Sequence, residues 1–412
     1  MKILYNLPRE VKFCKICVNS NQYPASTVEF KHTRDRKGAS YVNFNEDGIC
    51  DGCVQADIKN NKINWKNREK DLIKLLNKYR RNDGSYDCLV PGSGGKDSAY
   101  AAHLLKYKYK MNPLTVTWPP IMYTDYGKQN FEKWLEIGGF DNIVSKPNPR
   151  TMKLITRLAI ENLLHPFQTF MLGQKNLAPK IAKQHNISLV FYGENEAEYG
   201  NPVADNKSSL RDKSFFTYKN MNDIFLSGVK VTKLIKKYKV SLTDLSQFLP
   251  LSLKEFKKNN IQVHYLGYYI KWIPQEAYYY AVENTGFKAR PHRTEGTYSK
   301  YNSIDDKIDD LHYYTRFIKF GIGRATDDAS QEIRNNHINR EEAQQLVKRF
   351  DGEFPQRYFS EIMEYLEMDP KKFHKLCDKF RSPHLWKKIN GKWKLRHTVN
   401  FDGTDDKKNL NK

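Results

Sequence analysis

A glycine-rich segment at residues 90–98 carries the strongest chemical signal in the sequence. It reads VPGSGGKDS, follows a short apolar run that predicts a buried strand, and precedes a predicted helix. Glycines there let successive backbone N–H groups point inward, and the N-terminus of the helix adds positive potential. We therefore expect this turn to bind a phosphate chain, with Lys96 and Asp97 at its solvent-facing mouth. The alternative is an ordinary strand-to-helix turn, and the spacing does not match the G-x-x-x-x-G-K-[ST] phosphate loop.

Four cysteines form a second constellation. Cys14 and Cys17 make one C-x-x-C pair, and Cys50 and Cys53 make another. Two such pairs supply four thiolates to one tetrahedral ion and leave no position for water, which predicts structural Zn²⁺ in a segment with too little core to fold alone. An iron–sulfur cluster or a redox pair is the alternative. The other two cysteines, at positions 88 and 377, fall inside a predicted strand and a predicted helix, which is typical of buried fillers.

Three later stretches carry polar groups next to glycines. They are FYGENEAEYG at 191–200, RTEGTY at 293–298 and FGIGRATDDA at 320–329. The first follows a predicted parallel strand, so Gly193, Glu194 and Asn195 could bind substrate or Mg²⁺, although capping and turn chemistry would explain them equally well. For Arg324 and Asp327 the alternative is the start of a helix capped by Thr326.

Short apolar runs alternate with helical patterns around these residues. After an amphipathic helix at 65–81, we expect strands at 86–90, 114–118, 142–144 and 189–192, and helices at 97–106, 130–137, 152–164 and 177–184. This βα alternation predicts an α/β fold with a doubly wound parallel sheet, whose ligand lies beyond the carboxyl ends of the strands where the strand order reverses.

The second half is less regular. We expect short helices within 230–259, a further strand at 265–272, and a helix that is capped near Ser303 and ends at Gly321. The chain is then predicted to be helical to about residue 389. We divide it into a zinc-binding segment at 1–62, an α/β domain at 63–330 with substrate-binding insertions at about 200–300, and a helical region at 331–412.

Composition bounds the class of protein. The chain has 412 residues, 39% hydrophobic, with 69 Lys and Arg against 47 Asp and Glu, a formal net charge of +22. This excludes a mainly disordered chain, and no apolar run is long enough for a membrane span, so we expect a soluble, cytoplasmic protein without membrane attachment. The charge suits nucleic acid, an anionic membrane or a phosphorylated small substrate, but much of it could simply serve solubility.

The SGGKDS motif at 93–98 resembles the PP-loop of the ATP pyrophosphatases, which include GMP synthetase, NAD synthetase and tRNA-thiolating enzymes. The resemblance implies that ATP is split between its α and β phosphates, with Mg²⁺ on the pyrophosphate. It assigns pyrophosphate binding to Ser93, Gly94, Gly95 and Ser98, charge neutralisation to Lys96, loop or Mg²⁺ positioning to Asp97, and backbone contacts with adenine to Thr115, Val116 and Thr117.

Several motifs together narrow the resemblance. The paired cysteines, SGGKDS, GEN at 193–195, EGTY at 295–298, IDDK at 304–307, FGIGRAT at 320–326 and INREEA at 338–343 resemble the N-acetyl sugar amidotransferases of bacterial surface-polysaccharide and flagellin-sugar pathways. The resemblance covers 14 to about 380. It implies that the acetamido group of a nucleotide-activated sugar becomes acetamidino through an O-adenyl imidate, with Glu194 or Glu295 as candidate bases and with Arg324 and Asp327 near the nucleotide.

The ammonia for this reaction must come from outside the chain. No cysteine has the surroundings of a glutaminase nucleophile, and residue 2 is lysine rather than a cysteine that processing could expose. The resemblance implies a separate glutaminase subunit, similar to the histidine-pathway amidotransferase, and a cyclase-like partner that conducts ammonia. The rival enzyme is a tRNA-thiolating PP-loop protein, and a zinc-ribbon adaptor with an inactive nucleotide fold is the non-enzymatic alternative; we do not expect nucleic acid as a partner.

Overall fold

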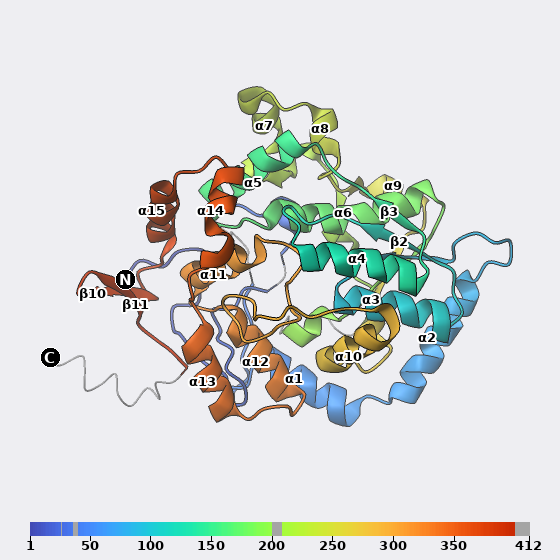
Figure 1. Ribbon diagram of the computed structural model, residues 1–412, viewed down its shortest axis with the longest axis horizontal. Helices are drawn as coiled ribbons and strands as arrows, with labels where there is room; N and C mark the ends of the chain where they lie inside the picture. Colours follow the sequence, from blue (N-terminus) through green and yellow to red (C-terminus); the bar gives the residue numbers. More distant parts are fainter. Residues whose placement is uncertain (26, 36–39, 200–207, 400–412) are drawn as a thin grey trace.

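A five-stranded parallel sheet forms the centre of the molecule in this computed structural model, which describes residues 1–25, 27–35, 40–199 and 208–399 (Figure 1). The strand order is β3-β2-β1-β4-β9, and every pairing is parallel. The chain proceeds outward from β1 to β3 and then returns to the other side of β1. The order therefore reverses between β1 and β4, which confirms the predicted doubly wound α/β fold. The strands are β1 (Cys88–Pro91), β2 (Pro113–Thr117), β3 (Asn142–Val144), β4 (Leu189–Tyr192) and β9 (Gln262–Tyr265).

Helices cover both faces of this sheet. Leu89, Leu114 and Val190 point into a core shared with α5 and α6, whereas Val90 and Phe191 point into a core on the opposite face. Because successive strand residues alternate between faces, strands buried on both sides are apolar throughout. The helices are α5 (Pro149–Leu163) and α6 (Gln168–Gln184) on the first face, and α2 (Trp65–Tyr79), α3 (Lys96–His103), α4 (Asp125–Gly138) and α10 (Pro274–Thr285) on the second.

The N-terminal segment holds Cys14 and Cys17 outside any helix or strand, whereas Cys50 is the N-cap of α1 (Asp51–Asp57) and Cys53 lies in the first turn of that helix. This segment does not fold apart from the rest of the chain, because Tyr5, Leu7 and Phe30 belong to the main core. The Tyr5 hydroxyl also donates to the Phe380 carbonyl, 2.8 Å away near the C-terminal end. The first residues of the chain are therefore packed against its last helices.

An insertion separates β4 from β9. It contains short strands and helices, and the predicted short helices within 230–259 are confirmed, while residues 200–207 lie outside the described residues. The strand predicted at 265–272 is wrong: β9 ends at Tyr265 because the chain turns at Gly267, whose N–H donates to the Gly193 carbonyl at 2.9 Å. The elements are β5 (Thr217–Tyr218), β6 (Phe225–Leu226), β7 (Val229–Lys230), α7 (Val231–Tyr238), α8 (Leu242–Ser246), β8 (Leu251–Ser252) and α9 (Leu253–Lys258).

The C-terminal region is helical, with two departures from prediction. Helix α11 ends at Gly321 as predicted but starts six residues after Ser303, because the Asp306 carboxylate accepts the N–H groups of Ile121 and Met122 and holds its segment beside that loop. The helical region predicted to reach about residue 389 ends earlier, because residues 386–395 form a hairpin. The elements are α11 (Asp309–Phe320), α12 (Arg324–Arg334), α13 (Arg340–Phe350), α14 (Gln356–Tyr365), α15 (Pro370–Phe380), β10 (Trp386–Ile389) and β11 (Lys392–Leu395).

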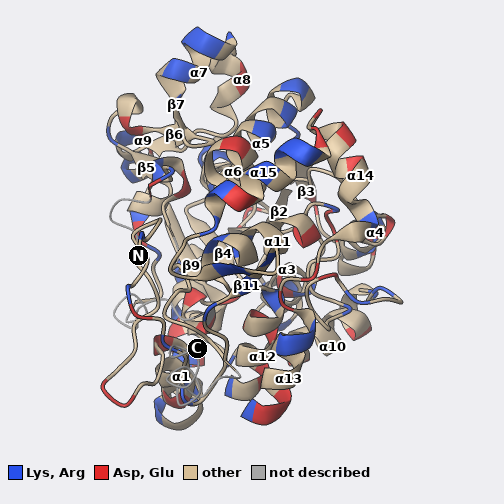
Figure 2. Cartoon of the chain, turned by 90° about the vertical axis from the view of Figure 1, so that its left-hand side faces the viewer, with Lys and Arg blue, Asp and Glu red and all other residues tan. Residues whose placement is uncertain are grey.

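Lys and Arg positions occur on many helices and strands, and Asp and Glu positions occur among them (Figure 2). Among the described residues, no helix has both the length and the apolar character needed to cross a membrane.

Candidate functional site

The glycine-rich turn joins β1 to α3 as predicted. Gly94 has a φ of +83°, and a Cβ there would lie 2.7 Å from the Phe131 Cα; a Cβ on Gly92 would lie 2.5 Å from the Ser98 Cβ. Both positions therefore require glycine. Gly95 precedes the helix without a side-chain cap, so the first N–H groups of α3 point out of the helix as donors for an anion.

Two adjoining cavities open beside this turn, with volumes of about 550 Å³ and about 390 Å³. Ser93, Gly95 and Asp97 line both, together with Glu194 and Arg316. Because Glu194 follows β4 and Ser93 follows β1, the cavities lie at the carboxyl ends of the two strands between which the order reverses. The predicted location of the ligand site thus coincides with a cleft.

The polar residues of the turn form short-range contacts. Lys96 Nζ lies 2.6 Å from an Asp97 carboxylate oxygen, and the Lys96 side chain is only 7% exposed, so it is buried at the smaller cavity rather than at a solvent-facing mouth. The Ser93 hydroxyl donates to Asp305 (2.8 Å), and the Ser98 hydroxyl donates to the Gly95 carbonyl (3.0 Å). These bonds fix the loop before any ligand binds.

Residues 115–117 of β2 meet the site only in part. Val116 lines the larger cavity, and its carbonyl accepts the N–H of Gly92 at 2.9 Å. The Thr115 and Thr117 hydroxyls instead accept from the side chain of Asn142 on β3, and neither threonine lines the cleft. Of the three, the structure brings Val116 to the cavity wall.

The turn after β4 brings Glu194 and Glu196 to the larger cavity. Glu194 lines both cavities, whereas the Asn195 side chain accepts the N–H of Ala197 at 3.2 Å and so caps the following turn. Gly193 lines the larger cavity, and its carbonyl accepts the N–H of Gly267. Glu194 is thus placed to act on a ligand, while Gly193 and Asn195 shape the turn.

The predicted site residues of the C-terminal half do not all lie at the cleft. Arg324 and Asp327 lie in the first turn of α12 and line the smaller cavity; Thr326 is inside the helix rather than its cap. Glu295 is elsewhere: its carboxylate accepts the N–H of Arg357 at 3.0 Å, at the start of α14. The structure therefore does not bring Glu295 to the described cleft.

Sequence reasoning missed two residues that α11 places in the cleft, Arg316 and His312. Arg316 donates to Asp327 at 2.6 Å, and although burial opposes its charge, that carboxylate raises the pKa of Arg316. Burial, and after it the charge of Arg316, lowers the pKa of His312 to about 3, so the imidazole is neutral.

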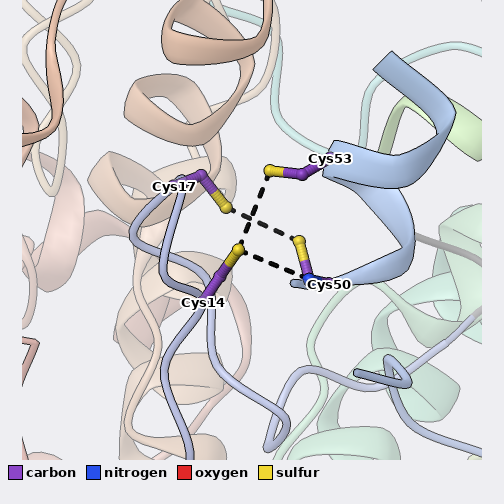
Figure 3. A group of neighbouring side chains, drawn as sticks. All are labelled: Cys14, Cys17, Cys50 and Cys53. Carbon is purple, nitrogen blue, oxygen red and sulfur yellow. Dashed lines mark hydrogen bonds between the residues drawn. The ribbon is translucent and has the colours of Figure 1, made fainter. Parts of the chain in front are cut away.

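The four cysteines converge as predicted (Figure 3). Cys14 and Cys53 sulfurs are 3.8 Å apart, and Cys17 and Cys50 sulfurs are 3.6 Å apart. Four sulfurs at about 2.3 Å from a tetrahedral ion lie about 3.8 Å from one another, so the cluster fits a structural metal with all four positions filled by protein.

A buried arginine connects this cluster to the cleft. Arg334, at the end of α12, lies 3.5 Å from the sulfurs of both Cys17 and Cys50 and donates to the Glu198 carbonyl at 2.8 Å. The Glu198 carboxylate in turn accepts from Lys59 at 2.8 Å. The residues that follow Glu194 are therefore fastened to the cysteine segment.

Comparison with known proteins identifies the C-terminal part of the chain. Residues 295–400 match the family model of the LPS biosynthesis protein WbpG-like, C-terminal domain. The uncharacterized protein MJ1599 of Methanocaldococcus jannaschii is 30% identical over 103 residues, which are 25% of this chain and 31% of the relative, so the chain spans about a third of that protein's length.

Two solved structures show weak overall similarity. The NH3-dependent NAD synthetase of Campylobacter jejuni has 14% identity and a TM-score of 0.28 over 48% of this chain and 95% of its own. The U34-tRNA thiolase NcsA of Methanococcus maripaludis has 11% identity and a TM-score of 0.28 over 77% and 88%. Neither similarity is high enough to compare sites. The match to the WbpG-like C-terminal domain covers residues 295–400, which include Arg324 and Asp327 of the cleft, and it supports the predicted resemblance to N-acetyl sugar amidotransferases.

Proposed function

We propose that the chain is the synthetase component of an ATP-dependent amidotransferase that converts the acetamido group of a nucleotide-activated sugar into an acetamidino group. One observation carries the proposal. The smaller cavity is lined on one side by the glycine-rich turn, from Ser93 to Asp97, and on the other by Arg324 and Asp327 of the WbpG-like region. A phosphate-binding turn and the family-specific region thus face the same space.

The chemistry requires that an amide oxygen become a leaving group. The oxygen attacks the α-phosphorus of ATP, pyrophosphate departs, and the resulting O-adenyl imidate is attacked at carbon by ammonia; AMP then leaves with the former amide oxygen. Loop N–H groups and Lys96 would stabilise the charge on the departing pyrophosphate. Of the two predicted bases, Glu194 lines the cleft and could take a proton from the incoming nitrogen, whereas Glu295 lies at the start of α14.

Mg²⁺ would be held by oxygen ligands of the cleft. Asp97 and Glu194 both line the two cavities and supply the carboxylates that this ion prefers. When bound, the ion would neutralise phosphate charge. The cysteine cluster lies apart from these residues and fits a structural role, which we assign to Zn²⁺.

We assign ammonia supply to a separate glutaminase and, with it, a cyclase-like conducting subunit. The two cysteines outside the cluster support this assignment, because neither lines the described cleft and both are buried. Burial raises the pKa of Cys88 and raises that of Cys377 to about 12, so neither is a thiolate near neutral pH. The same facts disfavour tRNA thiolation, which needs a sulfur-carrying cysteine at the loop.

The proposal is tested by mass spectrometry of nucleotide sugars. Purified chain is incubated with ATP, MgCl2 and ammonium chloride and with acetamido sugars carried by UDP or CMP. The expected product has the small mass loss of C=O replaced by C=NH, with AMP formed in equal amount. Nucleotide sugars that lack an acetamido group are the control. RNA-dependent AMP release without any sugar product would contradict the proposal.

A further inference from the structure

A second group of metal-ligating side chains lies on the wall of the larger cavity. A carboxylate oxygen of Glu29 is 3.3 Å from Nδ1 of His32 and 3.9 Å from Nε2 of His165. One ligand atom from each of the three residues lies within 4.8 Å of the other two. None of the three belongs to the glycine-rich turn or the cysteine cluster, and the sequence motifs gave no sign of them.

Local structure brings the three residues together. Glu29 begins the single 3₁₀ turn Glu29–Lys31, and His32 follows it, so the two side chains sit one turn apart on the same side. His165 lies just after the C-terminal end of α5. Leu164, which caps this helix, has a left-handed φ of 47°, so the chain changes direction before His165. The cluster thus joins the N-terminal segment to the helical layer of the sheet.

The cluster is fixed and largely buried. Glu29 and His32 are each 4% exposed, and the His165 side chain is 12% exposed. The buried Gln168 side chain donates to the Glu29 carbonyl at 3.0 Å and accepts the N–H of Ser227 at 2.9 Å, which holds the 3₁₀ turn in place. The Thr27 hydroxyl also donates to the Glu29 carboxylate at 3.2 Å, so the carboxylate is oriented from within the N-terminal segment.

The separations fit a shared ion. Nitrogen and oxygen ligands about 2.1 Å from a tetrahedral ion lie about 3.4 Å apart, close to the observed 3.3 Å and 3.9 Å. Two imidazoles with one carboxylate select zinc or a neighbouring divalent transition metal, whereas Mg²⁺ and Ca²⁺ prefer oxygen alone. Glu29 and His165 also line the larger cavity, so the remaining coordination positions would face its contents.

We infer that Glu29, His32 and His165 form a second metal site, which takes a divalent transition-metal ion and leaves it open to the cleft. The inference does not rest on the proposed function, because it concerns the ligand set alone. The chain would then have two different metal centres. Four thiolates enclose one ion, whereas the nitrogen–oxygen site leaves its ion open to the cavity that Asp97 and Glu194 also line.

Cobalt spectroscopy separates the two centres. The full chain is loaded with Zn²⁺ at its cysteines, freed of excess metal and titrated with Co²⁺ alone. Occupation of the histidine–glutamate site should give weak visible d–d absorption without sulfur-to-cobalt charge transfer, together with a further ion per chain by elemental analysis. Intense near-ultraviolet charge transfer would instead report cobalt at the cysteines.

Variants assign the signal. Glu29→Gln and His165→Gln each remove one ligand with little change of volume, and each should weaken Co²⁺ binding by about 100-fold or more, since even outer-sphere changes weaken metal sites by up to about that factor. His185→Gln, which changes an exposed histidine at the end of α6, is the matched control and should bind Co²⁺ as the unaltered chain does.

The fold is monitored through the cysteine centre. Retention of its zinc in the Glu29 and His165 variants shows that the chain is intact, because Phe30 and the cysteines belong to the same N-terminal segment. The inference is overturned if the zinc-loaded chain binds no further Co²⁺, or if both variants retain the unaltered affinity. Loss of the weak bands in the variants and not in His185→Gln supports it.

Discussion

Lys96 and Asp97 form a close ion pair at the smaller cavity, where the lysine lies in the first turn of α3 beside the helix N-terminus that would bind a phosphate. We expect Lys96→Ala to lower AMP formation by about 100-fold or more, the scale of losing one donor to a developing charge. Lys74→Ala, on the exposed side of α2, is the control and should leave the rate unchanged. AMP release is measured by chromatography; activity retained in Lys96→Ala would remove this lysine from the site.

Asp310 is a buried carboxyl group in the first turn of α11. Burial, opposed by Arg290 and reinforced by Glu295, raises the pKa of Asp310 from 3.8 to about 7. Because the folded form holds its proton more tightly, its contribution to stability is complete below about pH 4 and is lost as the pH rises toward about 7. The loss is up to about 1.4 kcal/mol for each pH unit in that window.

Asp310→Asn should remove this dependence. Denaturant unfolding at about pH 5 and about pH 7 is expected to show a smaller fall in the free energy of unfolding for Asp310→Asn than for the unaltered chain. Asp369→Asn, at an exposed helix cap, serves as the comparison. An equal fall in all three proteins would show that Asp310 is charged in the folded state.

How much of the site could be predicted depended on sequence distance. The turn at 93–98 was predictable because strand, glycines and helix are contiguous, and Gly94 is indeed sterically required. Glu194 was predictable for the same reason, as the residue after a buried strand. Arg316 and Asp305 reach the same cleft only through the packing of α11 and the segment before it, and a single sequence does not show how these elements pack against the sheet. Glu295 was assigned to the cleft wrongly for the same reason.

At the scale of elements, buried strands were predicted best. The predicted strand at 189–192 is confirmed without change, since a run buried on both faces is apolar along its whole length. The C-terminal hairpin was missed although Asn390-Gly391 is a strong hairpin signal, with φ values of 50° and 75° that suit a two-residue turn. Its strands carry many lysines, so they lack the apolar alternation that identifies a strand.

Helix α12 contacts the cysteine cluster at its C-terminal end and lines the smaller cavity at its N-terminal end, so it connects the two sites. Its Arg334 lies against the cysteine sulfurs, and the thiolates hold the pKa of Arg334 well above its usual range although burial opposes the charge. The same helix presents Arg324 and Asp327 to the smaller cavity. Loss of the metal should therefore disturb the cleft as well as the N-terminal segment.

Cys14→Ser should lower bound zinc, soluble yield and thermal stability together, because a closed four-thiolate site contributes on the order of 10 kcal/mol of apparent binding free energy to folding. Cys377→Ser makes the same chemical change at a buried site in α15 and should leave the zinc content unaltered. Elemental analysis and thermal unfolding measure both. Iron with acid-labile sulfide, in place of zinc, would show that the cluster holds a different centre.

At the scale of the whole molecule, the formal charge of +22 comes from Lys and Arg on many elements, with Asp and Glu among them (Figure 2). A net positive charge gives general attraction for anions. The positive groups placed to meet an anionic ligand are those that line the smaller cavity, Lys96, Arg316 and Arg324.

The nitrogen source depends on whether the described cavities contain a cysteine nucleophile that could hydrolyse glutamine. With no accessible cysteine among the residues lining the described cavities, the isolated chain should form amidine from ammonium chloride and not from glutamine. The ammonia-driven rate should rise with pH as ammonium loses its proton, and addition of the cognate glutaminase should restore the use of glutamine.

Without ammonia, water is the remaining nucleophile for the imidate, and its attack returns the original amide while ATP is consumed. The chain with sugar and ATP alone should therefore release AMP slowly and leave the sugar unchanged, as measured by paired chromatography of AMP and mass spectrometry of the sugar. Cys377→Ser is the control for a hidden nucleophile in α15. Glutamine-dependent amidine formation by the purified single chain, abolished in Cys377→Ser, would refute the two-component scheme and would require α15 to open, because Cys377 is 1% exposed.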